Sequence, residues 1–109
     1  MRRGRIPRPY LGVGTQTVRL SEGLRERLQT DQRSAVIVVD VQPDSPAAAA
    51  GLMVGDVIVS LGGTRITEPS DLRAVLRPQQ VGEIVTLMVA RGGEPREVRL
   101  TIGERTRRS

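Results

Sequence analysis

The chain has 109 residues, enough for one domain with a modest core, and 38% of them are apolar. It contains no His and no Cys, which excludes a Ser-His-Asp triad, a Cys-His pair, a His-ligated metal site and a disulfide. The net charge is +5, but residues 9–104 hold ten arginines against twelve acidic residues, so the positive excess belongs to the two ends.

Arginine concentrates at both ends of the chain. Residues 1–8 predict a basic linker, because their arginines, glycine and proline oppose helices and strand ladders. Residues 104–109 predict a basic tail, which leaves 9–103 as the domain. Binding of nucleic acid or a membrane surface through these arginines is a remote alternative, since no stacking aromatic residues accompany them. No apolar run approaches membrane-spanning length, and no signal-peptide core follows Met1, so we expect Met1 to begin a mature fragment.

The first half of the domain predicts two strands and two short helices. Alternation over residues 11–18 predicts a strand, and its two glycines allow another backbone to approach closely. A short helix is expected over 22–29, followed by a polar loop and a buried, β-branched strand over 35–41. Ser45 as N-cap and Gly51 as left-handed exit then predict a helix over the four alanines between them.

The second half predicts two hairpins separated by a helix. Residues 57–61 and 64–66 form the first hairpin around a turn of two glycines. Pro69, Ser70 and Asp71 open a helix over 69–77, and Pro78 ends it. Residues 84–90 and 97–102 alternate well and form the closing hairpin.

These elements predict a mainly β domain. The strands lack the regular βα alternation of a doubly wound sheet and are too many for a helical bundle. We therefore expect a partly open barrel or sandwich of five to six strands, capped by two to three short helices.

Two segments carry a resemblance to a known family. The run DSPAAAAGLMVGDVI at residues 44–58 resembles the SPAxxAGLxxGDxI segment of bacterial PDZ domains. The run RPYLGV at residues 8–13 resembles the carboxylate-binding loop of PDZ domains in HtrA-type (Do-like) trypsin-like serine proteases. The resemblance covers about residues 8–103 and implies a PDZ-like fold. It also implies a peptide-binding groove beside the helix at 69–77.

The resemblance implies that an extended peptide joins the sheet as an added strand, and that its terminal carboxylate meets backbone amides. The candidate amides are those of Leu11, Gly12 and Val13, and Gly12 allows backbone angles that a Cβ would oppose. Gly14 continues the strand, and Thr15 lies further along the groove.

Five side chains complete the expected site. Leu11 or Val13, or both, form the floor of the pocket for the last peptide side chain, and Leu76 walls it. Arg73 lies one turn earlier, near the rim, where it can select acidic or polar side chains upstream. Tyr10 begins the loop and packs its ring against the domain. Simple packing for Tyr10 and a solvated surface position for Arg73 are the alternatives.

The resemblance implies a regulatory or substrate-recognition module of an HtrA-type protease in envelope protein quality control. Its partners would be C-terminal or extended segments of unfolded proteins and a protease domain N-terminal to this chain. Nucleic acid is not among them, and a membrane tether is allowed only in the parent protein. A PDZ domain from a site-2 metalloprotease, a C-terminal processing protease or a secretion component is the alternative.

We expect no catalytic residue, cofactor or metal in this chain. Ser45 and Ser70 are interpreted as helix caps rather than nucleophiles, because no base accompanies either of them.

Overall fold

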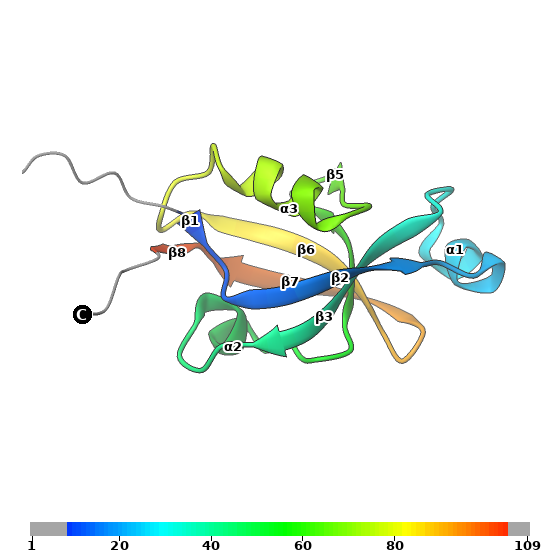
Figure 1. Ribbon diagram of the computed structural model, residues 1–109, viewed down its shortest axis with the longest axis horizontal. Helices are drawn as coiled ribbons and strands as arrows, with labels where there is room; N and C mark the ends of the chain where they lie inside the picture. The colour runs from blue at the N-terminus through cyan, green and yellow to red at the C-terminus, as the bar shows by residue number, and fades with distance from the viewer. Residues whose placement is uncertain (1–8, 105–109) are drawn as a thin grey trace, which may run out of the picture.

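The computed structural model describes residues 9–104, which form strands and helices in the order shown in Figure 1. In chain order, the elements are β1 (Pro9–Tyr10), β2 (Val13–Arg19), α1 (Glu22–Leu28), β3 (Ser34–Val41), α2 (Pro46–Ala50), β4 (Val57–Leu61), β5 (Thr64–Arg65), α3 (Pro69–Leu76), β6 (Ile84–Arg91), β7 (Glu94–Thr101) and β8 (Gly103–Glu104). No helix in this part of the chain is long and apolar enough to cross a membrane.

Most strands belong to one antiparallel sheet. Its order is β2-β3-β4-β6-β7, and the short β5 also pairs with β4. The six strands predicted from the sequence are therefore present, and the mainly β fold is confirmed. The sheet curves between α2 and α3, which lie on opposite sides of it, while α1 lies at one end of the molecule (Figure 1).

A second, two-stranded sheet was not predicted. β1 pairs with β8, with Pro9 opposite Glu104 and Tyr10 opposite Gly103. Pairing therefore extends one residue into the segment expected to be tail. The expected linker at residues 1–8 and the remaining tail at 105–109 lie outside the described residues, so these parts of the domain division stay predictions.

Local capping explains α2, which packs against the loop before β2. The Ser45 hydroxyl accepts a hydrogen bond from the amide of Ala48 (3.1 Å), and Pro46 occupies the first turn. Gly51 ends the helix with φ of 86°. Both capping predictions for this helix are confirmed.

The start of α3 differs from the expectation. Glu68, not Ser70, occupies the N-cap position, and no side chain caps it. Instead, the carboxylate of Asp71 accepts hydrogen bonds from the amide (2.9 Å) and hydroxyl (2.7 Å) of Thr67. These bonds fix the loop at the helix start, so a cap at Ser70 is not needed.

The core is aliphatic throughout. Its largest fully buried side chains come from β4, β6 and β7 and from the segments after β5 and β7: Ile58, Leu61, Leu87, Val89, Leu100, Ile66 and Ile102. β3 also contributes, but it is not buried along its whole length as predicted. The register between β2 and β3 shifts next to Gly14, where Val39 has no partner and is 43% exposed.

A buried ion pair fixes the far end of α2. Asp56 is 1% exposed, and Arg91 donates to its carboxylate through Nε (2.9 Å) and Nη2 (2.8 Å). Arg91 also donates to the carbonyl oxygen of Gly51, while the Met53 amide donates to Asp56. Burial alone would raise the pKa of Asp56, but the hydrogen bonds from Arg91 and Met53 outweigh it and hold that pKa below its ordinary value.

Candidate functional site

A groove lies between β2 and α3. β2 pairs only with β3 among the described strands, so its other edge is open beside the helix. α3 runs in the opposite direction to β2 (Figure 1). The groove has a volume of about 290 Å³ and is lined by Pro9, Tyr10, Leu11, Gly12, Val13, Thr15, Pro69, Leu72, Arg73 and Leu76.

The loop before β2 forms one end of this groove. The sequence predicted a strand from residue 11, but β2 begins at Val13. Gly12 has φ of 88°, in the left-handed region, so the chain turns before it enters the strand. Gly12 also packs directly on the N-cap of α2, where an added Cβ would clash with the Ser45 Cβ and lie 2.8 Å from its hydroxyl oxygen. The alternation of side chains over residues 11–18 did not predict this turn.

Two amides of the loop point toward the open side. The carbonyl oxygen of Leu11 accepts from the Ala47 amide (2.9 Å), and that of Gly12 accepts from the Gln42 amide (2.8 Å). All peptide bonds here are trans, and in a trans peptide the N–H points opposite to the preceding carbonyl. The N–H groups of Gly12 and Val13 therefore point away from α2 and β3. Participation of the Leu11 amide stays a prediction.

The groove is mainly apolar. Leu11 and Leu72 belong to the buried core, and Val13 and Leu76 pack against that core while remaining partly exposed. Leu76, expected as the wall of the pocket, therefore lines the same groove as Leu11 and Val13, expected as its floor. Thr15 lies further along the same strand. An aliphatic side chain entering here would bury its surface against these residues.

Seven of the eight predicted site residues line the groove, and Gly14 does not. A Cβ on Gly14 would lie 3.3 Å from the Cβ of Asp40, so this residue faces β3 at the irregular register. Tyr10 lines the groove, and its hydroxyl oxygen would lie 3.2 Å from a Cβ on Gly12. Their roles in ligand binding stay predictions.

Three lining residues were not predicted: Pro9, Pro69 and Leu72. Pro69 and Leu72 share one face of α3 with Arg73 and Leu76, at spacings of three, four and seven residues. That spacing was visible in the sequence. Pro9 could not be found in the same way, because it reaches the groove through the pairing of β1 with β8.

The part of the chain that the structure describes holds no group of three or more Asp or Glu side chains arranged to bind a metal ion. The groove itself contains no acidic side chain and one basic residue, Arg73. Its chemistry is therefore that of an apolar trough with two outward amides at one end.

Comparison with known proteins identifies this architecture. A profile described as the PDZ domain matches residues 9–102. The chain belongs to the PDZ domain family. Over 100 residues, this PDZ domain is 37% identical to a probable periplasmic serine endoprotease DegP-like of Pseudomonas fluorescens, an alignment covering 92% of this chain and 21% of the relative. A DegP-like relative from Halomonas elongata is 35% identical over 101 residues, covering 93% of this chain and 21% of that protein.

Solved structures agree with the sequence relatives. The HtrA-type protease AlgW with a decapeptide superposes with a TM-score of 0.73 and 25% identity, covering 94% of this chain and 31% of that one. These similarities confirm the HtrA-type affiliation that the RPYLGV segment indicated. The relatives' names place them in the periplasm, in agreement with an envelope location. The PDZ domain spans about a fifth of the length of the curated relatives it matches.

Proposed function

We propose that this PDZ domain captures the C-terminal segments of polypeptides by adding them as a strand along β2. In this proposal it serves as a substrate-recognition or regulatory domain of an HtrA-type serine protease in envelope protein quality control. The observation that carries the proposal is the open edge of β2, with the outward amides of Gly12 and Val13 at its start.

The geometry favours one direction of binding. A terminal carboxylate held at the Gly12 and Val13 amides places the end of the peptide at the start of β2. The peptide then runs antiparallel to β2, and its backbone pairs with the free edge of the strand. Its last side chain enters the apolar trough between Val13 and Leu76. A groove of this size without aromatic walls other than Tyr10 favours Val, Leu or Ala at that position.

The expected affinity is moderate. Each main-chain hydrogen bond contributes a net of about 0.5–1.5 kcal/mol. One buried aliphatic side chain adds about 1.5–3 kcal/mol. The cost of association, several kcal/mol or more, opposes these gains, so a Kd on the order of micromolar is expected. Such binding suits a domain that samples many unfolded chains.

The similar proteins support this assignment. AlgW has been solved with a decapeptide and with a tripeptide, and the DegP-like relatives are serine endoproteases by name. A protease domain joined to this PDZ domain would supply the catalytic residues. Peptide capture would then localise or regulate proteolysis.

Titration of the ¹⁵N-labelled domain tests the proposal. The two ligands are a peptide ending in a free Val carboxylate and the same peptide with an amidated end. We expect the acid to shift the amide resonances of residues 12–15 and to bind at least about tenfold more tightly. Resonances of β7, the opposite edge of the sheet, should not move. Equal affinity of the two peptides, or shifts centred on β7, would contradict the proposed mode.

A further inference from the structure

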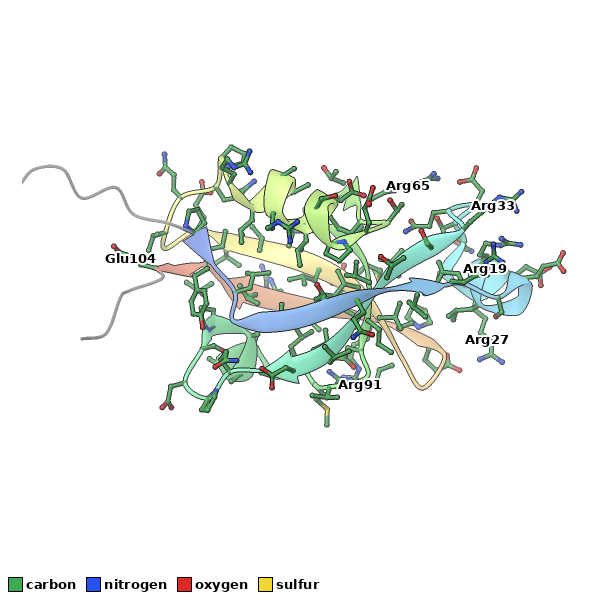
Figure 2. The ribbon with its side chains drawn as sticks, viewed as in Figure 1. Arg19, Arg27, Arg33, Arg65, Arg91 and Glu104 are labelled. Atoms are coloured by element: carbon green, nitrogen blue, oxygen red, sulfur yellow. The ribbon has the colours of Figure 1, made fainter. Side chains whose placement is uncertain are left out.

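Among the residues that the structure describes, Arg73 is the only charged one that lines the groove. Its side chain is exposed, and no residue of the described range 9–104 forms an ion pair or hydrogen bond with it. Other arginines have carboxylate partners: Arg27 lies 3.7 Å from Glu94, and Arg65 lies 2.7 Å from Asp31. Both lie toward the α1 end of the molecule, away from Glu104 (Figure 2). Arg73 is thus a positive charge available to a ligand in the groove.

The position of Arg73 along α3 selects one ligand residue. α3 runs opposite to β2, so Leu76 lies nearer the start of β2 and Arg73 lies further along it (Figure 1). Three residues of helix advance about 4.5 Å. In an added strand, side chains on the same face recur every two residues, about 6.8 Å apart. If the last side chain packs at Leu76, the side chain two residues earlier faces Arg73, within reach of its flexible stem.

We propose that Arg73 gives this PDZ domain a preference for peptides with an acidic side chain two residues before the C-terminal residue. This inference rests on the proposed function, since it takes the peptide direction from it. A guanidinium offers a planar fork of donors that matches a carboxylate, and no acidic residue lines the groove to repel one. Basic side chains at the same peptide position would meet repulsion from Arg73 and gain no compensating partner.

Matched peptides and variants test this preference. Two labelled peptides differ only by Glu or Gln two residues before a C-terminal Val, and a third carries the Glu one residue before Val. The wild-type domain should bind the first Glu peptide roughly two- to fivefold more tightly than the Gln peptide, the range of partly exposed ion pairs. Raising the salt concentration should shrink this ratio. The third peptide should show no gain, because its Glu points away from α3.

Arg73→Gln should bring the Glu-to-Gln ratio to one by lowering the affinity for the Glu peptide. Arg73→Lys should keep part of the preference. Arg77→Gln is the matched control: it removes the same charge one turn later, at an exposed residue outside the groove lining. A control that lowers the ratio as much as Arg73→Gln would overturn the proposal.

The outcomes separate this inference from the proposed function. Equal losses for both peptides in Arg73→Gln would show that Arg73 holds the terminal carboxylate, which overturns the side-chain preference but retains peptide capture. Binding of both peptides with no preference in the wild type would overturn the role of Arg73 alone. No binding of either peptide would overturn peptide capture and this inference together.

Discussion

The two edges of the sheet are built differently. β2 (VGTQTVR) carries one charged residue, Arg19, at its end, and α3 lies beside its open edge. Among the described strands β7 (EPREVRLT) also pairs with one strand only, but it carries a proline and four charged residues, all of them exposed. Unpaired edges invite association, and proteins block it with charges and proline. β7 has these protections and β2 lacks them.

This contrast separates two tasks of the domain. The open edge of β2, the loop at Gly12 and the wall at Leu76 serve ligand binding in the proposed function. The Asp56–Arg91 pair, at the β6 end that leads into the β7 hairpin, serves stability. Variants at the ion pair should therefore change the free energy of unfolding and leave affinity unchanged, and variants in the groove should change affinity.

The largest expected effect is at the buried ion pair. Arg91→Leu leaves the buried carboxylate of Asp56 without its charged partner, so the free energy of unfolding should show its largest loss here. Chemical denaturation at pH 7 should show this loss. The Kd for a C-terminal peptide should change by no more than about twofold, because substitutions away from a site usually shift free energies by about 0.5 kcal/mol or less. Unchanged stability, or a selective loss of binding, would contradict the separation.

The same pair predicts the response to acid. The pKa of Asp56 is lower in the folded state than its ordinary value of 3.8. The stabilising contribution is therefore complete above about pH 4 and is lost as the pH falls through the lower, folded-state pKa. Denaturation midpoints between pH 6 and pH 2 should fall for the wild type. The denaturation midpoint of Arg91→Leu should fall less over the same pH range. Equal falls for the two proteins would contradict the ion pair of Asp56 as a source of the acid sensitivity.

Sequence patterns predicted the elements well because the signals there are local. Alternation marked β2, β6 and β7, and Ser45 and Gly51 marked the ends of α2. The pairing of β1 with β8 was missed because each strand has two residues and the two lie at opposite ends of the domain. Strand segments this short leave no periodic pattern to detect.

The residues that form the site were predicted more completely than their arrangement in space. Resemblance brought Leu11, Arg73 and Leu76 to one groove, but the turn at Gly12 depends on its contact with Ser45, thirty-three residues later. No partner was predicted for Asp56, since Arg91 lies 35 residues away. Long-range contacts of this kind leave no mark on the spacing of neighbouring residues.

Gly12→Ala should show the next largest effect. The substitution combines positive φ with a clash against Ser45, so we expect a loss of about 1–3 kcal/mol in stability and no measurable peptide binding. Gly93→Ala is the matched control in the β6–β7 turn. It has φ of 83°, and a Cβ there meets only the flexible end of Arg27. The control should lose stability and keep its affinity; equal affinity losses in both variants would show that the defect is global.

Leu76→Ala should weaken binding without a comparable loss of stability. Leu76 packs on the core yet remains partly exposed in the groove, so truncation removes contact with the last peptide side chain. A loss of about 1–2 kcal/mol, near tenfold in Kd, is expected for a peptide ending in Leu. Ile84→Ala, at a residue 64% exposed outside the groove lining, controls for general loss of apolar surface. If the two variants bind the peptide with similar affinity, Leu76 does not contact the last peptide side chain.

The smallest effect is expected at β7, where it bears most directly on the difference between the edges. Replacing Arg96, Glu97 and Arg99 with Thr keeps the strand propensity but removes the charges that protect the edge. All three are exposed, so unfolding free energy should change by about 0.5 kcal/mol or less for each. Sedimentation velocity over rising protein concentration should detect self-association in the triple variant but not in the wild type, with peptide affinity unchanged at low concentration. If the variant stays monomeric, charge is not what keeps β7 unpaired, and the proline or the neighbouring α2 would have to provide that protection.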